Sequence, residues 1–333
     1  MKAGVWTGPG RLEYQDWPDP VLLDDGVIVR VAYCGICGSD THIVEQNLPI
    51  GPPPQVIGHE VSGVIQDVGR KVRDLEPGMP VACNFYGPCG ACAYCRLGQP
   101  NHCVRMFYGA KGLAQFAAYR ADLVYPLPDG VDLRGGALLE PTATCLYAVE
   151  QSELRPGERV LVIGAGPMGL LTAQLARRVG AARVVVTEPD ATKRELALAV
   201  GADDALDPRT TDLSEYARTT GEREGFDVIY DAAGAREATA AAVALLAKRG
   251  RLMIIAVHGR DSTVEISPFL LYQRELVLRS AYATADTFAR ALPLLRSLRL
   301  DDIVTAVEPL ADISNVYQRH RAGEYTKVLI SPE

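Results

Sequence analysis

The sequence predicts an α/β protein with two parts: a β-rich part at the start of the chain, then a doubly wound parallel sheet. Short apolar runs with alternating polarity, such as 27–32 and 61–68, lie among glycines and prolines in the first 85 residues, which is typical of strands and tight turns. From residue 159 onward, apolar strands alternate regularly with helical segments, and this succession is characteristic of a parallel sheet. A length of 333 residues also favours about two domains.

The elements of the second part can be placed from their apolar periodicity. Strands are expected at residues 159–163, 184–187, 227–230, 251–257 and 276–279. Helices are expected at 141–152, 170–179, 191–200 and from Gly234 to about residue 248. Near the end of the chain we expect one more helix, at 284–297, and a closing strand at 326–330.

Composition and charge argue against several classes of protein. A net charge of −7 without a basic run argues against a nucleic-acid-binding surface. The longest apolar runs, 241–247 and 252–257, are far too short to span a membrane. The N-terminus lacks the apolar segment of a signal peptide, so we expect a cytoplasmic protein. In that compartment, eight cysteines do not indicate a disulfide framework.

Four of the cysteines lie close together in the sequence. Two overlapping Cys-x-x-Cys steps place Cys89, Cys92 and Cys95 in one loop, and Cys103 follows eight positions later. Four thiolates in so short a segment favour a tetrahedral zinc site over the two alternatives, a redox-active dithiol or incidental cysteines. Such a site has no open position, so its zinc would stabilise a lobe of the structure and take no part in chemistry.

A glycine-rich turn follows the strand at 159–163 and opens the helix at 170–179. The turn has the pattern Gly-x-Gly-x-x-Gly and consists of Gly164, Ala165, Gly166, Pro167, Met168 and Gly169. An acidic residue, Glu188, stands nineteen positions past the last glycine, at the end of the next strand. In this context the pattern predicts a dinucleotide site, with the pyrophosphate at the helix N-terminus. The alternative is a glycine-rich turn that binds no nucleotide.

The acidic residue bears on which dinucleotide binds. Glu188 would accept hydrogen bonds from the adenosine ribose hydroxyls and repel a 2′-phosphate, so NAD is favoured over NADP. Lys193 and Arg194 lie nearby in the sequence and weaken this preference slightly. Val257 and the segment after it are expected at the carboxyl edge of the sheet, near the nicotinamide. His258, in that segment, has the alternative of being an ordinary loop residue.

The densest group of reactive side chains lies near the N-terminus. Together these side chains offer a thiolate, imidazoles, carboxylates and a hydroxyl, which a catalytic zinc and a proton relay need. Taken singly, each has an ordinary interpretation, such as a serine that caps a turn or an aspartate in an Asx-turn. The residues are Cys37, Ser39, Asp40 and His42, followed by His59 and Glu60.

These motifs, in this order and spacing, resemble the zinc-dependent medium-chain alcohol dehydrogenase family over essentially the whole chain. One departure is 77–81, Pro-Gly-Met-Pro-Val, where many relatives carry Gly-Asp-Arg-Val; it affects a turn and no predicted site residue. The residues that carry the resemblance are Gly35-Ile36-Cys37-Gly38-Ser39-Asp40-x-His42, Gly58-His59-Glu60-x-x-Gly63, the four-cysteine loop, Glu140-Pro141 and the glycine loop 164–169.

The resemblance implies a fold of two domains. Residues 1–143, with a structural zinc lobe at about 83–105, would form a GroES-like β-barrel together with the returning segment 282–333. A Rossmann domain that binds NAD would be inserted between them, at 144–281. Members of the family pair through the edge of the Rossmann sheet, here near 275–280, so a homodimer or homotetramer is expected.

The resemblance also implies ligands for a catalytic zinc. Cys37 and His59 match family ligands, and Glu140 stands where liver-type enzymes have a cysteine. A glutamate at this position is similar to the pattern of the polyol, sugar and aminocyclitol dehydrogenase branch. In that branch such a glutamate binds the metal directly or through water, and the glutamate that matches Glu60 can also bind it. A carboxylate in place of a thiolate makes the site harder and suits substrates with neighbouring hydroxyls. Without the resemblance, Glu140 has the alternative of being a surface carboxylate before a proline.

In the mechanism that the family implies, zinc lowers the pKa of the bound alcohol. Ser39 takes the proton, which passes through the cofactor ribose to His42 and solvent, and a hydride leaves for the nicotinamide. Asp40 matches a residue that orients the ligand imidazole.

The expected function is NAD-dependent oxidation of a secondary alcohol in a small-molecule polyol, sugar or aminocyclitol, with one catalytic and one structural zinc per chain. The alternative within enzymes is a simple secondary-alcohol or threonine-type dehydrogenase. The alternative of another class is a non-catalytic nucleotide-binding relative. Such relatives, like the zinc-free quinone reductases, usually lack the zinc ligands that this chain keeps.

Overall fold

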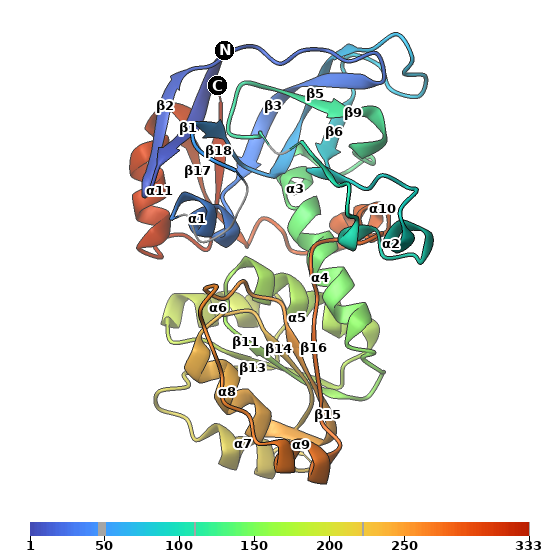
Figure 1. Cartoon of the computed structure of the whole chain (residues 1–333). Coiled ribbons are helices and arrows are strands. Elements are labelled where there is room, and N and C mark those ends of the chain that lie inside the picture. Colours follow the sequence, from blue (N-terminus) through green and yellow to red (C-terminus); the bar gives the residue numbers. More distant parts are fainter. Residues whose placement is uncertain (46–50, 110, 222, 333) are drawn as a thin grey trace. The chain divides into compact units, whose positions relative to one another are not determined.

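The computed structural model describes residues 1–45, 51–109, 111–221 and 223–332. The chain divides into two compact units, Met1–Ala143 together with Ala285–Glu333, and Thr144–Thr284. The first unit is thus made from both ends of the chain, and its blue and red segments lie side by side in Figure 1. Among the described residues, no helix combines the length and the apolar character needed to cross a membrane.

The first unit is built on β-sheets. Its seven-stranded sheet has the order β10-β6-β5-β3-β18-β17, with β9 paired to β3, and a three-stranded sheet has the order β2-β1-β4. The predicted strands at 27–32 and 61–68 are confirmed as parts of β3 and β5. The strands are β1 (Lys2–Gly8), β2 (Arg11–Asp16), β3 (Gly26–Gly35), β4 (Gln55–Val56), β5 (Glu60–Val68), β6 (Pro80–Cys83), β7 (Tyr86–Gly87), β8 (Phe107–Tyr108), β9 (Phe116–Arg120), β10 (Val124–Pro126), β17 (Val304–Pro309) and β18 (Lys327–Ser331).

The closing strand lies inside the first unit. β18 pairs with β3 on one side and β17 on the other, so the last residues of the chain occupy the interior of the large sheet. Side chains from both ends share one core, in which Val29 and Ile65 lie in the same buried cluster as Val316 and Ile330. Burying each such side chain stabilises the fold by roughly 1.5–3 kcal/mol. The predicted strand at 326–330 is confirmed to within one residue at each end.

The helices of the first unit are short. The helix predicted at 284–297 is wrong in extent, because α10 has four residues and continues as a 3-10 turn at Leu292–Ser297. Pro293 lies at this change and cannot donate the backbone hydrogen bond that a continuing α-helix needs. The helices are α1 (Gly38–Val44), α2 (Ala93–Arg96), α3 (Leu133–Ala137), α10 (Phe288–Ala291) and α11 (Ile313–Arg321), and α4 (Leu139–Gln151) contains the boundary between the units; further 3-10 turns are Pro100–His102, Ala121–Leu123 and Leu310–Asp312.

Six parallel strands form the sheet of the second unit, in the order β13-β12-β11-β14-β15-β16. The chain moves outward from β11 to β13 and then, on the other side, from β14 to β16, which is the predicted doubly wound arrangement. The strands are β11 (Arg159–Ile163), β12 (Arg183–Thr187), β13 (Asp204–Leu206), β14 (Phe226–Asp231), β15 (Leu246–Ile254) and β16 (Val277–Ser280); the helices are α5 (Pro167–Val179), α6 (Ala191–Ala199), α7 (Leu213–Thr219), α8 (Arg236–Leu245) and α9 (Pro268–Arg274).

One boundary in this unit differs from the prediction. The helix expected to reach about residue 248 ends at Leu245, because Leu246 already pairs with Phe226 of β14. β15 therefore begins and ends earlier than the predicted strand 251–257. The run of alanine, valine and leucine at 241–247 fits a helix as well as a buried strand, so pairing with β14 decides where the helix stops.

Candidate metal centres and dinucleotide loop

Three predicted metal ligands of the first unit converge in space. One ligand atom from each of Cys37, His59 and Glu60 lies within 4.8 Å of the others. Cys37 directly precedes α1 and Glu60 opens β5, so the start of a helix and the start of a strand meet here. A thiolate, an imidazole and a carboxylate are donors that zinc takes in proteins. These residues therefore fit the predicted catalytic zinc, and we call them the mixed-ligand centre.

Asp40 joins the helix to the histidine. Its Oδ2 accepts a hydrogen bond from the backbone N–H of Cys37 at 2.9 Å, as an acidic residue in the first helical turn commonly does. Its Oδ1 lies 3.3 Å from Nδ1 of His59, and Oγ of Ser39 lies 3.4 Å from Nε2 of the same ring. Burial lowers the pKa of His59, but the charge of Asp40 and hydrogen bonds with Asp40 and Cys37 outweigh it and raise the pKa well above its ordinary value. Asp40 thus contacts the imidazole that it was predicted to orient.

Glu60 is held by a buried lysine that sequence analysis missed. Nζ of Lys327 lies 2.7 Å from both carboxylate oxygens of Glu60 and donates to the backbone oxygen of Ile36 at 3.0 Å. The side chains of Lys327 and Glu60 are only 2% and 0% exposed. The carboxylate also lies so close to Gly35 that a Cβ there would be 1.9 Å from its Oε2, so a side chain at this position would displace the carboxylate. The only signal in the sequence was a lysine at the start of an apolar strand, 267 positions from its partner.

Glu140 and His42 do not belong to the mixed-ligand centre within the described part of the chain. Glu140 is buried in the first turn of α4. His42 lies in the last turn of α1, three positions after Ser39, so the two side chains lie on the same side of the helix. Metal binding by Glu140 and proton transfer by Ser39 and His42 stay predictions.

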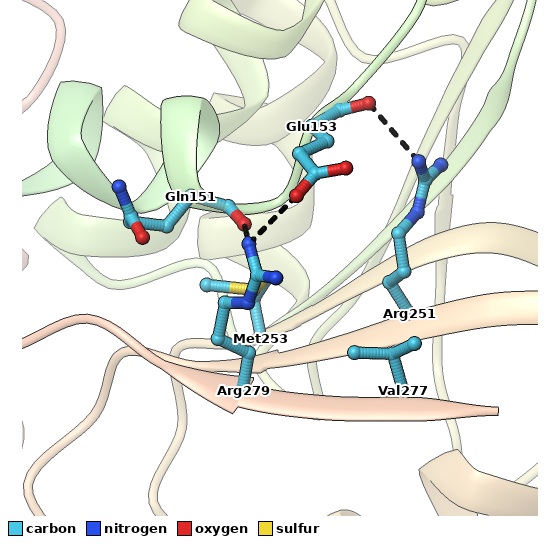
Figure 2. A pocket seen from close by; sticks show the side chains of 6 residues that line it. All are labelled: Gln151, Glu153, Arg251, Met253, Val277 and Arg279. Carbon is cyan, nitrogen blue, oxygen red and sulfur yellow. Dashed lines mark hydrogen bonds and ion pairs between the residues drawn. The ribbon is translucent and has the colours of Figure 1, made fainter.

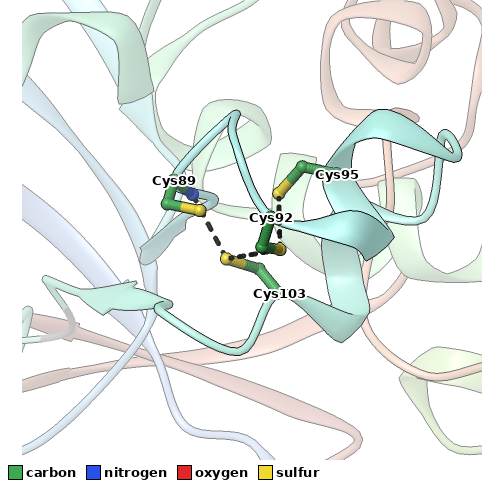
Figure 3. Close-up of side chains that lie close together, drawn as sticks. All are labelled: Cys89, Cys92, Cys95 and Cys103. Atoms are coloured by element: carbon green, nitrogen blue, oxygen red, sulfur yellow. Dashed lines mark hydrogen bonds between the residues drawn. The ribbon is translucent and has the colours of Figure 1, made fainter.

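The four predicted structural ligands also converge (Figure 3). The backbone N–H groups of Cys89 and Arg105 donate to Sγ of Cys103 at 3.2 and 3.3 Å. Backbone hydrogen bonds from Ala91 and Cys92 lower the pKa of Cys89 to about 6, whereas burial raises the pKa of Cys95 to about 11, so the thiolate is favoured at Cys89 and not at Cys95. A set of four thiolates fits a closed tetrahedral zinc site. We call these residues the four-cysteine centre; their Sγ atoms all lie within 4.8 Å of one another: Cys89, Cys92, Cys95 and Cys103.

The glycine loop of the second unit has the geometry that a pyrophosphate needs. Gly164 has a φ of 96°, and a Cβ on Gly169 would lie 1.9 Å from the backbone oxygen of Gly164. Gly166 caps α5, with Pro167 and Met168 as its first two residues. The loop therefore requires glycine where α5 packs against the turn, and the free N–H groups at the start of α5 fit an anion.

The predicted ribose-binding acid lies beside this loop. Oε2 of Glu188 accepts a hydrogen bond from the backbone N–H of Ala165 at 2.9 Å. Val257, beyond the end of β15, is 45% exposed, and its contact with a nicotinamide stays a prediction. Nε2 of His258 lies 3.0 Å from Oδ2 of Asp231, a fully buried residue at the end of β14. His258 is therefore held at the carboxyl edge of the sheet, where the sequence placed it.

A small cavity of about 50 Å³ lies elsewhere in the second unit (Figure 2). Its two arginines are held within the cavity wall, because Arg251 donates to the backbone oxygen of Glu153 and Arg279 donates to Glu153 and to the backbone oxygen of Gln151. The cavity contains no predicted metal ligand and no residue of the glycine loop. It is not the candidate active site. Its lining is Gln151, Glu153, Arg251, Met253, Val277 and Arg279.

Comparison with known proteins finds relatives over most of the chain. Residues 23–129 match the family described as alcohol dehydrogenase GroES-like domain, and residues 167–297 match zinc-binding dehydrogenase. The chain is 34% identical over 301 residues to 2-dehydro-3-deoxy-L-galactonate 5-dehydrogenase of Pseudoalteromonas atlantica, which covers 87% of this chain and 86% of that protein. It is 31% identical over 343 residues to sorbitol dehydrogenase of Bombyx mori, with 98% and 97% covered.

A solved structure is similar over the same length. It is that of a candidate zinc-binding dehydrogenase from Sinorhizobium meliloti 1021 bound to NADP, with a TM-score of 0.93, 31% identity and 99% of each chain covered. The chain belongs to the zinc-dependent medium-chain alcohol dehydrogenase family, as its motifs predicted. It is an oxidoreductase that acts on CH–OH groups, and it combines the GroES-like fold with the Rossmann fold.

Proposed function

We propose that the protein transfers a hydride between NAD(H) and a secondary alcohol, or the matching ketone, of a polyol, sugar or aminocyclitol. The observation that carries the proposal is the convergence of Cys37, His59 and Glu60 in a chain that also has a glycine loop at the start of α5. The two curated relatives support the substrate class, because the compounds in their names carry several hydroxyl groups.

Two groups of residues would hold zinc. Cys37 and His59, together with Glu140 or Glu60, would hold a catalytic ion, and the four-cysteine centre would hold a structural one. When bound, the catalytic zinc supplies a Lewis acid that makes the alcohol more acidic, and NAD supplies the hydride acceptor. Since both oxygens of Glu60 contact Lys327, any metal bond to Glu60 would use the remaining lone pairs of that carboxylate.

The side chains around the mixed-ligand centre would handle the proton. Oγ of Ser39 lies 3.4 Å from Nε2 of His59 and would take the proton of the alcohol beside the ligand set. His42, on the same side of α1, would pass that proton to solvent, since an imidazole can both accept and donate a proton. Asp40 faces Nδ1 of His59 and would favour the tautomer with its proton on Nδ1, which leaves Nε2 for the metal.

A substrate panel tests the proposed class. Polyols, cyclitols, amino-alcohols and short mono-alcohols are supplied with NAD and with NADP, and reduced cofactor is followed by absorbance. Turnover of polyols, sugars or aminocyclitols with NAD is the expected result. Strong turnover of mono-alcohols without turnover of polyols would instead identify a simple secondary-alcohol dehydrogenase, and turnover of threonine would identify a threonine-type enzyme.

Metal content separates an enzyme from a non-catalytic relative. About two zinc ions per chain are expected, one for each centre. A chain that holds one zinc ion or none and transfers no hydride to any compound of the panel would contradict the proposal.

We further infer a homodimer or homotetramer in the cytoplasm, with no nucleic-acid or membrane partner. β16 is the last strand in the order of its sheet. Val277 in this strand and Phe269 and Tyr272 in the preceding helix α9 are exposed, which supports pairing through this edge. The eight free cysteines fit a reducing compartment. Light scattering of the purified protein measures the assembly, and a monomer at micromolar concentration would contradict the inference.

A further inference from the structure

Two acidic residues follow neighbouring strands at one edge of the second unit. Glu188 comes directly after β12 and Asp207 comes directly after β13. The two strands are parallel, and the backbone N–H of Glu188 donates to the oxygen of Leu206 at 2.9 Å. Both acids therefore lie at the same carboxyl edge. Glu188 belongs to the predicted dinucleotide site, whereas neither the motifs nor the proposed mechanism give Asp207 a role.

Two arginines converge on the turn beside Glu188. Arg194 donates through Nη1 to the backbone oxygens of Glu188 and Pro189, at 2.9 and 2.7 Å. Arg209 donates through Nη2 to the same oxygen of Pro189 at 2.6 Å. The side chains of Arg194 and Arg209 are 23% and 65% exposed, so a ligand at this edge can reach both. Two guanidinium groups beside a predicted ribose-binding residue are the chemistry that recognises a phosphate.

Asp207 engages both of these arginines. Its Oδ1 accepts from Nε of Arg209 at 2.9 Å and its Oδ2 accepts from Nη2 at 2.6 Å, which is a two-bond contact between carboxylate and guanidinium. The same Oδ2 lies 3.5 Å from Nη1 of Arg194. The hydrogen bonds from Arg209 hold the pKa of Asp207 well below its usual range, so this carboxylate is charged at neutral pH.

We propose that Asp207 is a second determinant of dinucleotide choice, because it holds Arg194 and Arg209 on the Pro189 carbonyl and so keeps them from a 2′-phosphate. The inference rests on the proposed function, since it requires that the glycine loop bind a dinucleotide. Neutralising Glu188 alone would remove a repulsive charge but leave both cations paired. Recognition of a 2′-phosphate therefore requires the removal of both carboxylates.

The test compares Glu188→Ser, Asp207→Asn and the double variant, in the full-length protein without alcohol substrate. Calorimetry measures the dissociation constants of 5′-AMP and 2′,5′-ADP, and nicotinamide fluorescence measures those of NADH and NADPH. Glu188→Ser should weaken 5′-AMP binding and change 2′,5′-ADP binding little. The double variant should bind 2′,5′-ADP about tenfold more tightly than Glu188→Ser does, the equivalent of one strengthened charge-assisted contact.

A matched control separates this effect from net charge. Asp203 comes directly before β13, whereas Asp207 comes directly after it. Asp203 forms an ion pair with Arg177 and accepts a hydrogen bond from the backbone N–H of Val184. Asp203→Asn combined with Glu188→Ser changes the charge equally and should leave 2′,5′-ADP binding at the level of Glu188→Ser.

Three outcomes would count against the inference. An equal gain with Asp203→Asn would overturn it in favour of a general charge effect. A double variant that binds NADH but gains no affinity for 2′,5′-ADP would overturn the inference and leave the proposed function standing. A wild-type protein that binds neither NADH nor 5′-AMP would overturn the proposed function and the inference together.

Discussion

The two metal centres of the first unit differ in how far apart their residues lie in the sequence. The four-cysteine centre draws all its ligands from residues 89–103, whereas the mixed-ligand centre joins Cys37 to His59 and Glu60 and is supported by Lys327. One loop can form the first centre. The second requires the start of α1, the start of β5 and the last strand of the chain to be in place together.

The centres also differ in the charges around them. The mixed-ligand centre contains the buried carboxylate of Glu60, and two further buried charged side chains contact its members: Lys327 contacts Glu60 and Asp40 contacts His59. The candidate ligands of the four-cysteine centre are cysteines in one loop, and backbone N–H groups donate to Sγ of Cys103. We therefore expect the loss of a thiol at the four-cysteine centre to change mainly stability, and the loss of the Cys37 thiol at the mixed-ligand centre to change mainly activity.

The largest expected effects come from removing one thiolate at each centre. Cys37→Ala should lower kcat on the order of a thousandfold or more, with one zinc ion lost and the melting temperature nearly unchanged, since the Lewis acid is lost. Cys95→Ala should lose the other zinc ion and lower the melting temperature, because metal binding there contributes folding free energy. Cys83→Ala, a buried thiol outside both centres, is the control. A Cys95→Ala variant that kept its melting temperature but lost activity would contradict the purely structural role of the four-cysteine centre.

The next largest effect should come from Lys327. Lys327→Met leaves Glu60 as an uncompensated buried charge and should lower the free energy of unfolding by about 3–5 kcal/mol, measured by urea denaturation. The double variant Lys327→Met/Glu60→Leu is the control, and it should recover most of that loss because no buried charge remains. If Lys327→Met were as stable as the wild type, the ion pair would not support the mixed-ligand centre.

A smaller effect is expected at Ser39. Ser39→Ala should lower kcat about a hundredfold while zinc content and melting temperature stay unchanged, since it removes a proton acceptor and no ligand. Thr41→Ala, on the same helix, is the matched control and should keep full activity. Steady-state kinetics together with metal analysis check both variants, and full activity in Ser39→Ala would exclude its role in proton transfer.

The smallest effect is expected at Asp40. Asp40→Asn keeps the shape of the side chain but weakens its contact with His59, so zinc should bind the mixed-ligand centre about tenfold to a hundredfold more weakly. Competition with a chelator measures this, and the zinc of the four-cysteine centre should be unaffected. Asp132→Asn, which alters the cap of α3, is the control. Equal weakening of both zinc ions would show that Asp40 acts on the fold of the first unit as a whole.

Those parts of the fold and of the candidate sites whose residues are close together in the sequence could be predicted from the sequence. The four cysteines and the glycine loop were found because their spacing alone constrains the geometry: a tight loop brings its own thiolates together, and a strand, turn and helix in succession place the glycines. The predicted strands of the second unit were found because buried parallel strands are continuous apolar runs. The family followed from these motifs together.

The errors have an equally physical cause. The helix predicted at 284–297 and the end of α8 were misjudged because a proline and a strand partner outweighed the local preference for helix. α1 was not predicted as a helix, since seven residues give too short a periodic signal. The sequence does not predict that Asp207 and Arg209 lie beside Glu188. The residues at the end of one strand do not show which strand lies next to it in the sheet.

The sequence by itself determined the family, the two ligand motifs and the dinucleotide loop, because each depends on residues within one or two elements. Only the tertiary structure decided that Lys327 neutralises Glu60 and that Asp207 holds two arginines beside Glu188. Both contacts depend on which strands lie next to each other, and burial then makes the choice of partner matter. When a charged residue stands in an apolar strand, the sequence indicates that it needs a partner of opposite charge. The fold then determines which residue that partner is.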